Sequence, residues 1–142
     1  MKRLAAVMVV TVLVGLPTLQ RAGADEEKKT PTIKQVMAKV HKGSPSLLKK
    51  VGDQLQEESP PWDTILNETK DFVSFGAALA KNEPPRGDKE SWAKLAQQYY
   101  DKSKAMDEAA RQKDDKAALA AQKNLTRSCA SCHAAHRKRP SR

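Results

Sequence analysis

Residues 114–137 of the chain read DDKAALAAQKNLTRSCASCHAAHR. The stretch contains no proline or glycine, and we expect a helix that starts near Asp114. Its small or apolar residues recur every three or four positions, the period of one helix face, at Ala118, Ala121, Leu125, Cys129, Cys132 and His136. The C-terminal end of the chain is therefore predicted to be a long helix with both cysteines on one face.

Earlier segments are separated by proline- or glycine-containing breaks at residues 30–31, 43–45, 59–61 and 82–87. Between these breaks apolar residues recur at helical spacing, and almost no strand alternation is present. The third helix is expected to open at Asp88. We predict an all-α fold, an antiparallel four-helix bundle with short connections.

The first segment, residues 33–55, keeps one helical phase on both sides of its internal proline and glycine. Thr30 can cap its start, with Pro31 at the first helical position. We interpret the segment as one kinked helix, or as two short coaxial helices with the second capped by Ser44.

Residues 1–24 have the features of a secretory signal peptide: a positive start, an apolar run over residues 4–16, and small residues before a cleavage point after Ala24. This run of 13 residues is shorter than the roughly 20 needed to span a bilayer. An uncleaved N-terminal anchor is the alternative. The prediction is a periplasmic domain, residues 25–142, with no membrane span after signal cleavage.

The chain is basic, with a formal net charge of +9 that falls to +6 when the three basic residues of the signal segment are removed. A basic surface favours acidic partners. Nucleic acid fits poorly, because the protein is predicted to be exported and its basic residues alternate with acidic ones.

Residues 129–133, CASCH, form the sequence signature for attachment of a c-type haem. Each thiol would add to one vinyl group, which fixes the porphyrin against the chain. On a helix Cys129 and His133 are four residues apart and share a face, so iron binding by the histidine becomes effectively intramolecular. The motif predicts one covalent haem c with its iron, tethered by Cys129 and Cys132 and bound by His133, on the C-terminal helix.

Other uses of two cysteines at this spacing fit the chain less well. A thioredoxin-type redox motif needs a preceding strand and a βαβ surround, which the sequence lacks. A zinc site would have to draw its ligands from two turns of one helix, because the only histidine elsewhere in the sequence is His41. Side chains from two turns of a single helix cannot enclose a metal tetrahedrally. A disulfide within a helix has poor geometry.

In length and architecture the region after the signal peptide resembles the class II c-type cytochromes, the cytochrome c′ family. These are four-helix bundles with the haem motif in the last helix. The resemblance implies thioether bonds at Cys129 and Cys132 and a proximal ligand at His133. It also matches Arg137 to a basic position on the same helix face, beside the cofactor, and Met37 to the residue over the opposite haem face.

Two positions depart from the family pattern. Ile33 stands where an arginine often precedes the distal position by four residues, and His136 stands where an aromatic residue commonly precedes Arg137. Both departures concern the expected contacts with the haem propionates.

The group opposite His133 determines the function expected of this architecture. Iron bound by Met37 would be six-coordinate and low-spin, suited to electron transfer, whereas an open position would bind nitric oxide or carbon monoxide. Met37 could instead be a core filler. Met106 is expected in the core, and His41 is expected to face water at the break after the first helix. His136, from the proximal helix, is not expected to reach the distal face.

The sequence thus predicts a periplasmic monohaem cytochrome that transfers single electrons with His133 and Met37 as iron ligands, and that is not an enzyme. One alternative is a five-coordinate, gas-binding haem protein. Another is a haem-free helical interaction module with an incidental motif. Partners would be redox proteins with acidic surfaces, steered by the basic residues 137–142. Apolar positions on the first two helices could also serve a homodimer.

Overall fold

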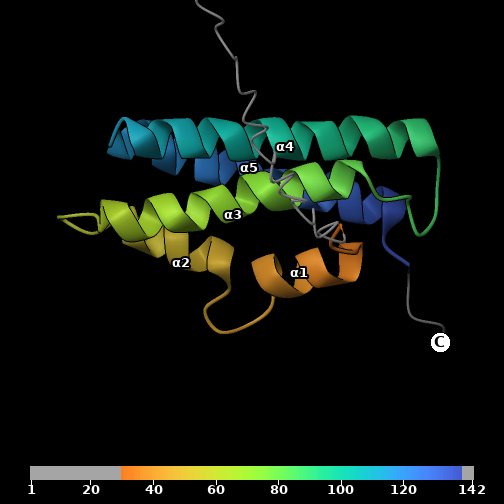
Figure 1. Cartoon of the computed structure of the whole chain (residues 1–142), viewed down its shortest axis with the longest axis horizontal. Helices are drawn as coiled ribbons and strands as arrows, with labels where there is room; N and C mark the ends of the chain where they lie inside the picture. The colour runs from red at the N-terminus through yellow and green to blue at the C-terminus, as the bar shows by residue number, and fades with distance from the viewer. Residues whose placement is uncertain (1–29, 139–142) are drawn as a thin grey trace, which may run out of the picture.

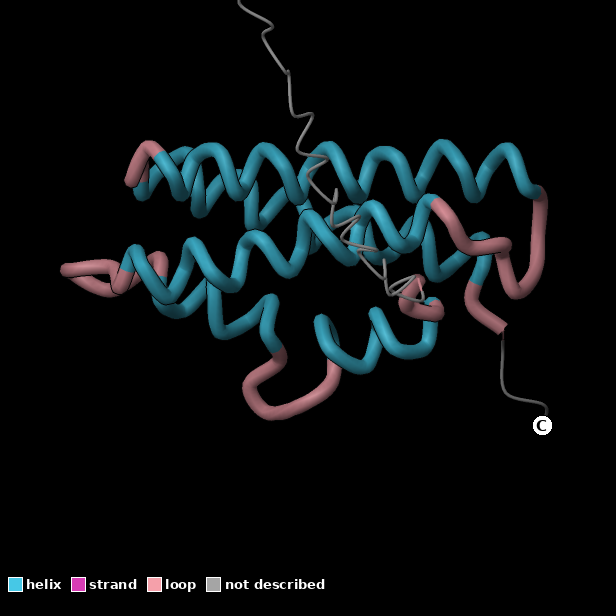
Figure 2. Tube along the Cα trace, viewed as in Figure 1, coloured by secondary structure: helices cyan, strands magenta, loops and turns pink. Residues whose placement is uncertain are grey.

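The computed structural model describes residues 30–138, which form five α-helices and no strand (Figures 1 and 2). The helices are α1 (Ile33–His41), α2 (Leu47–Gln54), α3 (Trp62–Ala80), α4 (Lys89–Arg111) and α5 (Asp115–His136). The all-α prediction is confirmed over this range, with one helix more than expected. The predicted signal peptide, residues 1–24, lies outside the described residues.

The three long helices form the main body of the domain, with α4 packed against both α3 and α5. The two short helices follow one another along one flank of this body (Figure 1). There α1 contacts α3, while α2 contacts both α3 and α5. The helices α1 and α2 therefore cover the side that the three long helices leave open.

The first segment is two helices and not one kinked helix. Gly43 adopts φ +103°, a left-handed conformation that is open to glycine and strained for other residues. Pro45 lacks the backbone N–H that a continuing helix would need. The apolar residues keep the same helical spacing on both sides of residues 43–45 because two separate helices bury the same face. An extended connection joins them.

Both short helices begin two residues later than predicted. Thr32, and not Thr30, caps α1 in a capping box, in which its hydroxyl accepts from the Gln35 N–H and the Gln35 side chain accepts from the Thr32 N–H. Ser46, and not Ser44, caps α2 by accepting from the N–H three residues later. The predicted caps were the wrong hydroxyl residues.

The starts of α4 and α5 agree with the sequence. The Asp88 carboxylate accepts the Ser91 N–H at 2.6 Å, and the Asp114 carboxylate accepts the Ala117 N–H at 2.9 Å. An aspartate at this position satisfies a free N–H and interacts favourably with the positive end of the helix dipole.

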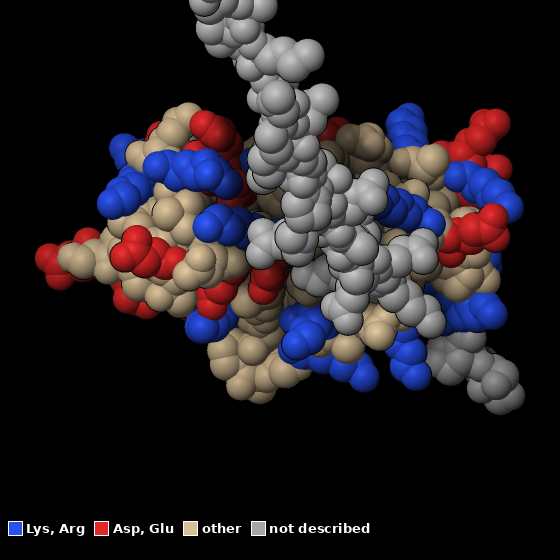
Figure 3. Space-filling view, viewed as in Figure 1, with Lys and Arg blue, Asp and Glu red and all other residues tan. Residues whose placement is uncertain are grey.

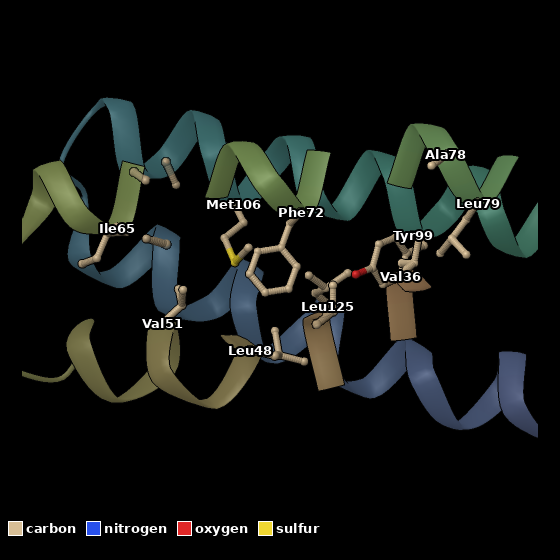
Figure 4. Packing of buried hydrophobic residues seen from close by; sticks show 14 of the residues in the cluster. Val36, Leu48, Val51, Ile65, Phe72, Ala78, Leu79, Tyr99, Met106 and Leu125 are labelled. Atoms are coloured by element: carbon tan, nitrogen blue, oxygen red, sulfur yellow. The ribbon is translucent and has the colours of Figure 1, made fainter. Parts of the chain in front are cut away.

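One apolar cluster draws residues from all five helices (Figure 4). Met106 is fully buried and lies beside the Phe72 ring, so its predicted place in the core is confirmed. The cluster also encloses a polar contact, in which Thr69 Oγ1 donates to Asp107 at 2.8 Å while Arg111 pairs with the same carboxylate at 2.8 Å. Each buried polar group in this contact is therefore satisfied.

On the face shown in Figure 3, basic and acidic side chains are interspersed. Among residues 30–138, no helix combines the length and the apolar composition that crossing a membrane requires.

Candidate functional site

A pocket between α1, α3, α4 and α5 brings together residues from both ends of the described chain. Met37 on α1 shares its lining with Cys129, Cys132 and His133 on α5. Four of the five predicted site residues therefore converge. The fifth, Arg137, is exposed at the C-cap of α5 and is not among the lining residues.

The motif reaches the pocket because it lies within the regular part of α5. Residues spaced by three and four positions share a helix face, so Cys129, Cys132 and His133 point to the same side. The Cys129 thiol donates to the Leu125 carbonyl one turn earlier, at 3.7 Å. Leu125 is fully buried and anchors the helix in the core just before the motif begins.

Both thiols are free and half-buried. Burial raises the pKa of the Cys129 thiol, partly opposed by a backbone hydrogen bond and by the charge of Lys102. Burial and then the neighbouring Cys129 raise the pKa of Cys132. Both groups are therefore protonated thiols at neutral pH. A neutral thiol is compatible with an apolar environment and is much less nucleophilic than a thiolate.

The α1 wall carries two potential iron ligands. Met37 is partly buried against the core, and His41, four residues later on the same face, also lines the pocket. Burial first, and then the charge of His133, lower the pKa of His41. His41 was expected to face water; it is instead partly buried at the end of α1 and lines the pocket.

Opposite α1, the pocket wall is formed by four residues of α4. Trp92 and Tyr99 are 5% and 7% exposed, with Leu95 and Ala96 between them. Trp92 Nε1 and Tyr99 Oη are buried without a hydrogen-bond partner in the described chain. Burial, and secondly Cys129, raise the pKa of Tyr99. Periodicity identified these positions as apolar, but it carries no information on where their polar atoms lie.

Unpaired buried donors cost free energy, about 1–3 kcal/mol each, so native structures rarely keep them. Here two such donors belong to residues that line the pocket with the motif. Two thiols, an imidazole and a thioether on an otherwise apolar lining are the groups that a c-type haem would use, so the residues present fit haem in their chemistry. The cavity itself has a volume of only about 20 Å³, so the helices would have to move apart to admit a group of that size.

His136, three residues beyond His133, has a structural role. Its Nδ1 lies 2.9 Å from the Arg86 carbonyl, which only accepts, so this nitrogen carries the proton. Nε2 is then free to accept from the Ser91 hydroxyl at 3.3 Å. The ring packs edge-on against Trp92, with 5.3 Å between centroids. With both nitrogens engaged, His136 holds the end of α5 against α4 and the preceding loop.

Within residues 30–138, no three His, Cys, Asp or Glu side chains are arranged to hold a metal ion. Comparisons of the chain with protein-family models, with curated proteins and with solved structures found no match.

Proposed function

We propose that this protein is a c-type haem protein that transfers single electrons, with one haem bonded to Cys129 and Cys132. The observation that carries the proposal is the convergence of Met37 with the motif on one apolar pocket. The two segments lie at opposite ends of the described chain, and only the fold brings them together.

In this proposal each chain residue has a defined task. The Cys129 and Cys132 thiols would tether the cofactor, each adding across a vinyl group with its hydrogen passing to the vinyl carbon. The His133 imidazole on α5 and the Met37 sulfur on α1 would hold the iron. Haem supplies an iron that alternates between ferric and ferrous states, and methionine ligation raises its potential.

The α4 residues exclude water and orient the group. Leu95 and Ala96 form an apolar wall, and the exclusion of water from this wall lowers the local dielectric constant. Trp92 Nε1 and Tyr99 Oη, buried and without partners among the described residues, could donate to polar atoms of the bound group.

The helix arrangement supports assignment to the class II c-type cytochromes. We interpret α1 and α2 together as the first helix of an antiparallel four-helix bundle, with α3, α4 and α5 as the others. Arg137, which the proposal also assigns to the cofactor, is exposed at the C-cap of α5 beyond the motif. We further propose a periplasmic location, acidic redox partners and no substrate turnover.

Absorption spectroscopy of the purified, haem-loaded protein tests the electron-transfer proposal. We expect low-spin spectra in both redox states and little change when carbon monoxide is added to the ferrous form. A high-spin ferrous form that takes up carbon monoxide without displacing a ligand would instead assign the five-coordinate, gas-binding function.

A further inference from the structure

We propose that His41 is a second iron-binding side chain of this pocket, so that either Met37 or His41 can take the position opposite His133. The inference rests on the haem attachment proposed above. It concerns which residue of this chain completes the coordination of the iron.

The first support is position. His41 lies four residues after Met37, which places the two side chains one above the other on the same face of α1. Both line the pocket, and both face the wall of α5 that carries His133. A group held between α1 and α5 by His133 would therefore have two potential ligands on its other side, separated by about 6 Å along the helix axis.

The second support is the nearness of the two imidazoles. His41 and His133 come from different helices, α1 and α5, and line one cavity. A group held in that cavity could therefore meet both imidazoles.

The third support is that the His41 ring is not otherwise engaged. His136 uses both ring nitrogens, toward Arg86 and Ser91. Within residues 30–138 the His41 ring makes no such hydrogen bond, although it is partly buried. A partly buried imidazole without a partner is available to a ligand.

The fourth support is the local backbone. His41 is the last residue of α1, and the chain leaves the helix through an extended Lys42 and a left-handed Gly43. Helix ends fray more readily than helix interiors. The backbone at His41 is therefore less constrained than the turns before it.

Imidazole and thioether both give low-spin iron, but methionine raises the potential relative to histidine. The competition between Met37 and His41 would therefore set the potential of the protein without changing its spin state. It would also keep the iron closed to gases when the methionine is lost.

The test uses three haem-loaded variants of the full chain: Met37→Leu, His41→Ala and the double variant. Leucine conserves the volume of methionine, and Met106→Leu is the matched control because that methionine is buried away from the pocket. Spin state, midpoint potential and carbon monoxide uptake are measured in each, and haem staining after denaturation reports the covalent bond.

We expect Met37→Leu to remain low-spin with a lower potential, and only the double variant to become high-spin and bind carbon monoxide. A Met37→Leu protein that is already as high-spin as the double variant would overturn the inference. A Met37→Leu spectrum and potential identical to those of the unmodified protein would refute Met37 as a ligand and would overturn the inference that the two residues share the position. Loss of haem stain from the unmodified protein would overturn both proposals at their common basis.

Discussion

His136 provides the sharpest test of how the site is supported. Its ring is 2% exposed, packs on Trp92 with 5.3 Å between centroids, and bonds to Arg86 and Ser91. Truncating a buried aromatic ring to alanine costs about 3–5 kcal/mol, and each lost hydrogen bond adds about 1 kcal/mol where water cannot replace it. The ring lies near the end of α5, where solvent can replace part of the loss. We therefore expect His136→Ala to lower the free energy of unfolding by about 3–4 kcal/mol.

A matched variant separates packing from hydrogen bonding. His136→Phe keeps a planar ring against Trp92 and removes both hydrogen bonds, so we expect a loss of about 1–2 kcal/mol. Urea unfolding of the haem-loaded proteins, followed by circular dichroism, measures both values. The comparison requires that the variants and the unmodified protein have the same dependence of unfolding free energy on urea concentration. The reasoning fails if the alanine variant loses less than about 1 kcal/mol, or if the phenylalanine variant changes the spin state of the iron.

Three further outcomes are expected. Gly76→Ala would place a methyl carbon 2.9 Å from the Tyr100 Cα, and we expect urea unfolding to show a net loss of stability of about 1–2 kcal/mol after the gain in helix propensity. Gly52→Ala is the control, because its methyl group would meet only the flexible end of a glutamine side chain, and its stability should be nearly unchanged. Equal losses of stability in the two variants would contradict the packing. In the haem-free chain, the raised pKa values of Cys129 and Cys132 predict slower alkylation by iodoacetamide near neutral pH than in an unfolded cysteine peptide, with the rate rising as pH climbs; equal rates would refute this. Electron exchange with an acidic partner should slow as salt is added, and a salt-independent rate would exclude steering by the basic surface.

Much of the fold follows from periodicity and capping chemistry. The positions of α3, α4 and α5 could be predicted because each is long, apolar on one face and bounded by proline, glycine or a capping aspartate. The first segment was harder. Thr30, Thr32, Ser44 and Ser46 all have side chains that can cap, and only Thr32 is followed three residues later by a glutamine that completes a capping box.

The candidate site was predicted in part. Helical spacing alone predicted that Cys129, Cys132 and His133 share a face, and the pocket contains all three. The same rule places His41 beside Met37, but the nearby glycine and proline led to the expectation that it faces water. The unpaired polar atoms of Trp92 and Tyr99 had no signal in the sequence, because hydrogen-bond satisfaction depends on tertiary contacts.

The most direct test of the central claim is the mass of the peptide that contains Cys129 and Cys132, from protein produced in a host that attaches c-type haem. The account predicts a red protein in which this peptide carries one haem that survives denaturation. A colourless protein, with the peptide at the mass of its unmodified amino acids, would contradict it.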